Sequence, residues 1–94
     1  MGMSFVLRYH QQVVSEDIPA LPKKERTRIQ KAITEKLTTH PEVFGKPLRR
    51  SLKGYRRLRV GEYRVVFRIE QETVKIFTIG HRSVVYEDYE SRLE

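Results

Sequence analysis

The sequence predicts an α+β domain. An N-terminal strand and a helical hairpin pack on an antiparallel sheet, in the order β-α-α-β-β-β, followed by a short C-terminal helix or tail. Apolar residues recur at helical spacing in the first half of the chain and alternate with polar residues in the second half. The 94 residues contain no cysteine, and 38% are hydrophobic, which suits one core without disulfides. We therefore expect a single domain over residues 1–94.

The first half is predicted to hold one strand and two helices. Residues 4–10 alternate apolar and polar side chains, as in a short strand. Residues 11–18 suit a brief helix. Pro22 suits the first position of a second helix that runs to about residue 39, and Pro41 ends it.

From residue 53 the alternation predicts three strands joined by two-residue turns at 61–62 and 71–72. Gly61 supplies the positive φ that the first position of a type II′ turn needs. The turns fix the register, because each turn sets which residues face each other. The expected pairs are Val60–Tyr63, Arg59–Arg64, Arg57–Val66, Tyr55–Arg68, Ile69–Val74, Arg68–Lys75, Val66–Phe77 and Arg64–Ile79.

This register sorts the side chains onto two faces. One face gathers Leu58, Val60, Tyr63, Val65, Phe67, Ile69, Val74 and Ile76, which would pack against the helices. The other face gathers arginines and, if the alternation continues, His81. Opposed like charges such as Arg59 and Arg64 cost stability, so an anion held between them is the better explanation. We expect Arg64 to be exposed, so that its removal would leave the fold intact. After the sheet, Val85, Tyr89 and Leu93 recur at helical spacing and are expected to pack.

The formal net charge is +7. Residues 46–68 contribute nine lysines and arginines against the single carboxylate of Glu62, and the rest of the chain is close to neutral. A solvated face usually mixes signs, so this segment indicates a polyanionic partner. No apolar run approaches the length needed to cross a bilayer, so we expect no membrane partner.

The sequence lacks the residues that several classes of active site require. The histidines show no metal-ligand spacing, the glycines form no phosphate-binding loop, and no serine lies in a nucleophile elbow. We therefore expect no metal and no cofactor. The remaining cluster of arginines with a histidine and a tyrosine suits RNA cleavage, because RNA carries its own nucleophile in the 2′-hydroxyl group.

Two motifs carry a resemblance to a known family. They are the run from Leu52 to Ile69, which reads LKGYRRLRVGEYRVVFRI, and the run from Ile79 to Tyr86, which reads IGHRSVVY. Together they resemble the RelE group of bacterial type II toxins in the RelE/ParE superfamily, and the likeness covers nearly the whole chain.

The resemblance implies a toxin that cuts messenger RNA on the ribosome by 2′-hydroxyl attack, without a metal. It also implies a co-expressed antitoxin, in a hetero-oligomer with the toxin, and a site of action in the cytoplasm of a bacterium or archaeon. We expect the antitoxin to be acidic and partly disordered, because it must cover a basic surface.

The family's catalytic positions fall on Arg57, Arg64, Arg82 and Tyr86. Where some members carry lysines, this chain has Tyr55 and Arg57, and arginine is a poor base. The general base is therefore open, and His81 is its best candidate because its ordinary pKa lies near neutrality. The expected RNA-binding residues are Lys46, Arg49, Arg50, Lys53, Tyr55, Arg56, Arg59 and Arg68.

Two other functions fit the same fold. A ParE-like toxin would inhibit DNA gyrase by protein binding, without catalysis. A non-enzymatic RNA-binding module is a third possibility, although it should expose aromatic rings for base stacking, and only Tyr55 and Phe77 are expected on the basic face. The combination of Arg64 with the 80–86 motif favours the nuclease.

Overall fold

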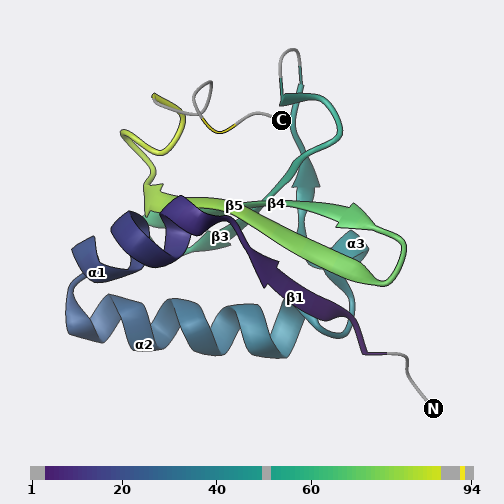
Figure 1. Cartoon of the computed structure of the whole chain (residues 1–94), viewed down its shortest axis with the longest axis horizontal. Coiled ribbons are helices and arrows are strands. Elements are labelled where there is room, and N and C mark those ends of the chain that lie inside the picture. Colours follow the sequence, from purple (N-terminus) through teal and green to yellow (C-terminus); the bar gives the residue numbers. More distant parts are fainter. Residues whose placement is uncertain (1–3, 50–51, 88–91, 93–94) are drawn as a thin grey trace.

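The computed structural model describes residues 4–49, 52–87 and 92. Its centre is a five-stranded sheet of order β1-β5-β4-β3-β2, with helices against one face (Figure 1). The predicted α+β class is therefore confirmed. The strands are β1 (Val6–Tyr9), β2 (Lys46–Pro47), β3 (Arg56–Val60), β4 (Tyr63–Glu70) and β5 (Thr73–His81).

The helical hairpin is also present. The first arm comprises a π-helical stretch η1 (Val13–Asp17) and α1 (Ile18–Ala20), and the second comprises α2 (Lys23–Ala32) and a π-helical stretch η2 (Ile33–Leu37). One helix was not predicted, the short α3 (Pro41–Phe44). The second arm ends at Leu37, slightly before the expected residue 39, and Pro41 begins α3, since proline is well suited to a first helical position.

The sheet is antiparallel except at one edge, where β1 runs parallel to β5 and Leu7 pairs with Val74. The sequence did not predict this parallel pairing. Figure 1 shows α2 along one face of the sheet and the segment that follows β5 on the other side. The main core lies between helices and sheet and contains Val13, Leu21, Ile29, Ile33, Leu37, Leu58, Val60, Val65, Phe67, Val74, Ile76 and Ile79.

The predicted register of β3 against β4 is confirmed at every pair from Arg57–Val66 to Val60–Tyr63. Gly61 has a φ of 60°, and Glu62 is not among the residues with positive φ. The turn therefore has the positive first position of a type II′ turn, as predicted.

The register of β4 against β5 is confirmed only in part. Ile69 pairs with Val74 and Arg68 with Lys75, but the register shifts between Val66 and Phe67. Beyond this bulge Val66 pairs with Thr78 and Arg64 with Gly80, so the predicted pairs Val66–Phe77 and Arg64–Ile79 are wrong. Both faces of β5 are buried here, so alternation cannot define the register.

The face opposite α2, which we call the arginine face, also carries a second apolar cluster. Leu52, Tyr55, Val66, Phe77 and Val85 are buried there, and Leu48 and Tyr86 pack against them. The expected orientation of Tyr55 and Phe77 toward this face is confirmed, but both rings are buried, at 9% and 5% exposed. The arginines therefore surround an apolar centre.

The β4–β5 turn supplies a first testable prediction. Gln71 has a φ of 55°, which L-residues other than glycine rarely adopt. Gln71→Gly should therefore raise the free energy of unfolding by about 0.5–1 kcal/mol in urea denaturation. Glu72→Gly is the matched control, because Glu72 does not have a positive φ, and it should lower the free energy of unfolding by a similar amount. Equal effects of the two changes would contradict this explanation.

Candidate functional site

The arginine face places like charges side by side on neighbouring strands. Arg59 pairs with Arg64 between β3 and β4, and Lys46 pairs with Arg57 between β2 and β3. Arg59 and Lys46 are exposed, and Arg57 is partly buried. Adjacent like charges destabilise a sheet, so this arrangement indicates a bound anion.

Arg64 does not lie at the surface, contrary to the prediction. Its side chain is only 8% exposed. Nη1 donates hydrogen bonds to the carbonyl oxygens of Gly61 (3.0 Å) and Tyr63 (2.9 Å), which hold the guanidinium group against the β3–β4 turn. Among the described residues, Arg64 has no carboxylate within ion-pair distance.

Arg82 is also fixed to this turn. Its backbone N–H donates to the carbonyl oxygen of Glu62 (2.8 Å), and its Nε lies 2.6 Å from the Glu62 carboxylate. Both side chains are more than 60% exposed. An exposed ion pair contributes little, so Arg82 can exchange Glu62 for another anion at small cost.

His81 lies on the opposite face from the one predicted. The bulge in β5 shifts the alternation, so His81 pairs with Tyr63, whose ring packs against the main core. The two rings meet edge to face, with centroids 5.5 Å apart. The Ser83 backbone N–H donates to Nδ1 of His81 (3.2 Å), so in the neutral ring Nε2 carries the proton. His81 thus offers solvent a donor and not the acceptor that a general base needs.

Tyr86 reaches the arginine face. It packs against the second apolar cluster, and the neighbouring Val85 lies over Gly80, the residue opposite Arg64. The Tyr86 hydroxyl is buried and has no hydrogen-bond partner among the described residues. A buried hydroxyl without a partner lowers the stability of the fold.

The predicted RNA-binding residues separate into three groups. Lys46, Arg49, Lys53 and Arg59 are exposed, and Tyr55 and Arg68 lie together on the arginine face, with the Arg68 guanidinium carbon 5.3 Å from the Tyr55 ring centroid. Arg56 belongs elsewhere, because it pairs with Phe67 of the main core and donates to the carbonyl oxygen of Gly45 (3.0 Å). Strand alternation places Arg56 and Arg57 on opposite faces of the sheet, and this signal was already present in the sequence. Arg50 lies outside the described residues.

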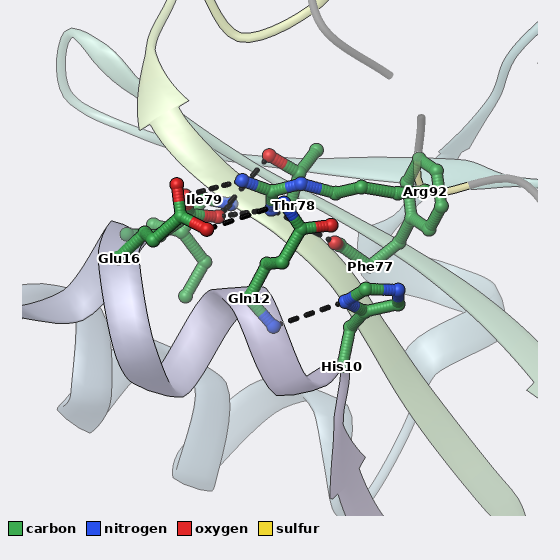
Figure 2. Close-up of polar contacts among 8 residues, drawn as sticks. His10, Gln12, Glu16, Phe77, Thr78, Ile79 and Arg92 are labelled. Atoms are coloured by element: carbon green, nitrogen blue, oxygen red, sulfur yellow. Dashed lines mark hydrogen bonds and ion pairs between the residues drawn. The ribbon is translucent and has the colours of Figure 1, made fainter. Parts of the chain in front are cut away.

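A buried ion pair, not anticipated from the sequence, joins Arg92 to Asp17 of η1. Arg92 is 9% exposed, and its two terminal nitrogens lie 2.5 Å and 2.7 Å from the carboxylate oxygens of Asp17. Figure 2 shows Arg92 beside Thr78 and Ile79 of β5. The same carboxylate accepts hydrogen bonds from the Ile79 N–H (2.9 Å) and the Thr78 hydroxyl (3.2 Å), directly after the bulge.

Near this ion pair, Val85 is buried as predicted, whereas Tyr89 and Leu93 lie outside the described residues. Within the described part of the chain, histidine and carboxylate side chains do not gather in groups of three suited to a metal ion. None of the helices in that part is long and apolar enough to span a membrane.

The fold matches solved toxin structures. The toxin–antitoxin complex RelBE2 from Mycobacterium tuberculosis aligns with a TM-score of 0.77 at 31% identity, over 86% of this chain and 94% of that one. The RelB–RelE complex from Methanococcus jannaschii aligns with a TM-score of 0.65 at 20% identity, over 86% and 96% of the two chains. The fold and the arginine face thus define a RelE/ParE-type protein.

Sequence comparison identifies the family. A model described as the ParE toxin of the type II toxin–antitoxin system parDE matches residues 7–86, and the chain belongs to this family. Two relatives from Mycobacterium tuberculosis are named Toxin RelE, 35% identical over 77% of this chain and 76% of the relative, and Toxin RelG, 36% identical over 74% and 83%. The chain is therefore a type II toxin of the RelE/ParE superfamily, and these relatives favour the RelE group over ParE.

Proposed function

We propose that this toxin is an endoribonuclease that cuts messenger RNA on the ribosome by attack of the RNA's own 2′-hydroxyl group, and that it acts in the cytoplasm. The buried guanidinium group of Arg64 carries this proposal. A buried cation usually has a carboxylate partner, because removing a charge from water is costly. The described residues give Arg64 backbone carbonyls instead, which orient the group without neutralising its charge. An RNA phosphate would supply the missing negative charge.

The chemistry needs three contributions. The 2′-oxygen attacks phosphorus and the bond to the 5′-oxygen breaks, which leaves a cyclic 2′,3′-phosphate and a 5′-hydroxyl end. Arg64, with Arg57 and Arg82, would stabilise the charge that builds on the phosphate oxygens. RNA binding would expose the Tyr86 hydroxyl, which is buried in the free chain. Tyr86 would then donate its proton to the departing 5′-oxygen and recover a proton from solvent. The 2′-hydroxyl proton would pass to a solvent water molecule, since His81 faces the other side of the sheet.

The decisive experiment induces the toxin in growing cells, maps transcript ends and monitors a DNA-damage reporter in parallel. A ribonuclease should create new 5′-hydroxyl ends within translated regions soon after induction and should leave the reporter silent. A gyrase inhibitor would activate the reporter without those ends. Repeating the mapping in a translation extract, with and without ribosomes, tests the dependence on the ribosome.

Arg64→Lys tests the role of the buried guanidinium. Lysine keeps the charge but lacks the planar fork that binds two phosphate oxygens, so the cleavage rate should fall about tenfold. Arg59→Lys is the matched control, because Arg59 is the exposed partner of Arg64 on the same face. It should retain most of the rate. A larger loss for Arg59→Lys would show that the buried arginine is not the principal charge stabiliser.

We also propose that an acidic antitoxin covers the arginine face. Two solved neighbours are complexes with RelB antitoxins, and this chain carries the same fold with a strongly basic face. An acidic segment that folds on binding would neutralise the cations and associate quickly. The test is co-expression with each neighbouring small reading frame. Co-purification and restored growth are expected from one of them, and harmless expression of the toxin alone would contradict the proposal.

A further inference from the structure

A pocket on the arginine face lies apart from Arg64, at the edge formed by β1. It has a volume of about 210 Å³ and is lined by Arg8, Tyr9, His10, Tyr55, Arg68, Lys75, Ile76 and Phe77. Arg64 and Arg68 face the same side of β4 four residues apart, so the pocket begins about 13 Å along the strand from the proposed cleavage site. We call it the β1 pocket.

The rim of the β1 pocket is a row of three cations on three neighbouring strands. Arg8 of β1 pairs with Lys75 of β5, and Lys75 pairs with Arg68 of β4. Among the described residues, the carboxylate beside them is Glu70. It forms ion pairs with Arg68 and Lys75, and the hydrogen bond from Lys75 holds the pKa of Glu70 below its ordinary value. Arg8 has no carboxylate partner among the described residues, so its end of the row favours an anion.

Arg8 is the cation in this row that is free to bind a ligand. Its side chain is exposed and has no ion pair or hydrogen bond among the described residues. A guanidinium group presents a planar fork of donors that matches two oxygens of a phosphate group.

The floor of the β1 pocket is aromatic. The Tyr55 and Phe77 rings lie 4.8 Å apart between centroids, and the His10 ring meets Phe77 edge to face at 6.1 Å. Nδ1 of His10 accepts the Gln12 backbone N–H (3.1 Å), so the neutral ring keeps its proton on Nε2 as a donor. Cations combined with aromatic rings are typical of surfaces that bind single-stranded nucleic acid. A nucleotide matches both features, because it joins a phosphate to a planar base, whereas an acidic side chain matches the cations alone.

We propose that the β1 pocket is a second RNA subsite, which binds one nucleotide of the single-stranded substrate away from the bond that is cut. Arg8 holds its phosphate beside Lys75, and the base lies on the half-buried His10 ring, behind which Phe77 and Tyr55 are buried. This inference rests on the proposed function, because it assumes that the arginine face binds RNA. The proposed subsite includes residues of β1, whereas the RNA-binding residues expected from the sequence all lie between residues 46 and 68.

The test measures binding of the full chain to a fluorescein-labelled 2′-O-methyl oligouridine octamer, which has no free 2′-hydroxyl group and cannot be cut by the proposed route. Arg8→Ala should weaken binding about threefold to tenfold. It should also reduce the slope of the logarithm of the binding constant against the logarithm of the salt concentration by about 0.7, as expected for one lost phosphate contact on a single strand. Because Arg8 is exposed on an edge strand, the fold should be unaffected.

Lys24→Ala is the matched control. Lys24 is an exposed cation of α2, on the other side of the sheet, so its loss should leave binding and salt slope unchanged. Equal weakening by both changes would reduce the effect to net charge and overturn the subsite. A competition experiment gives a second test. If polyglutamate displaces the octamer from the unaltered chain as efficiently as unlabelled RNA does, but fails to displace it from Arg8→Ala, the pocket binds an acidic polypeptide. That result would also overturn the RNA subsite.

The two proposals fail in different ways. If the unaltered chain cuts messenger RNA in a translation extract while Arg8→Ala binds the octamer as tightly as the unaltered chain, the subsite is wrong and the proposed function stands. If the unaltered chain cuts no messenger RNA, the proposed function is wrong, whatever Arg8 contributes to binding.

Discussion

Tyr86→Phe is expected to slow messenger RNA cleavage by about 10²–10⁴, the range for loss of a general acid. The same change should raise the free energy of unfolding by about 1 kcal/mol, because the hydroxyl is buried and has no partner among the described residues. The two effects have opposite signs, which a structural role for the hydroxyl cannot produce. Cleavage is measured in a translation extract, and stability by urea denaturation of the purified variant.

His81→Gln is the companion measurement. His81 lies on the other face of the sheet and presents a protonated nitrogen, so its replacement should have a much smaller effect on the rate than Tyr86→Phe. If His81→Gln proved the more damaging change, proton transfer would have to be assigned to His81. Loss of ribosome binding in parallel with loss of rate would show instead that Tyr86 is a docking contact.

Asp17→Ala is expected to lower the free energy of unfolding by about 3–5 kcal/mol, because it removes the carboxylate from the buried Arg92 guanidinium. The Ile79 N–H and the Thr78 hydroxyl lose their acceptor in the same step. This is a large part of the stability of a small domain. The measurement is urea or thermal unfolding followed by circular dichroism.

Glu62→Ala serves as the control for this second result. It also removes the carboxylate from an arginine, but both members of the Glu62–Arg82 pair are exposed, so the loss should be at most about 1 kcal/mol. Similar losses for Asp17→Ala and Glu62→Ala would contradict the importance given to burial of the Asp17–Arg92 pair.

The sequence predicted best where neighbours along the chain determine the structure. The register of β3 and β4 follows from alternation and from the positive φ of Gly61, and both are confirmed. Alternation failed where the strand is covered on both faces. Ile76, Phe77, Thr78 and Ile79 are all buried, so no periodic signal marks the bulge, and the Asp17 carboxylate that binds Thr78 and Ile79 is distant in sequence.

The candidate site was predicted correctly only where it depends on the β3–β4 register. Arg59 and Arg64 follow from the register, and their pairing is confirmed, whereas the placement of His81 was wrong because it depended on the part of β5 beyond the bulge. Arg64 is buried, and Val85 of the segment that follows β5 lies over Gly80, the residue opposite Arg64. No local pattern gives the position of that segment. The sign in the sequence was the apolar run Val65-Val66-Phe67, whose side chains point to both faces and are all buried.

The parallel pairing of β1 with β5 also affects how the sheet can assemble. The pairs β3–β4 and β4–β5 close through two-residue turns, so little chain entropy is lost in forming them. Leu7 and Val74 pair although most of the chain separates them in sequence. Their contact therefore closes a much larger loop and contributes strongly to the contact order. The three-stranded meander can therefore form from local contacts alone, whereas the β1 edge, and with it the rim of the β1 pocket, requires β5 to be already in place.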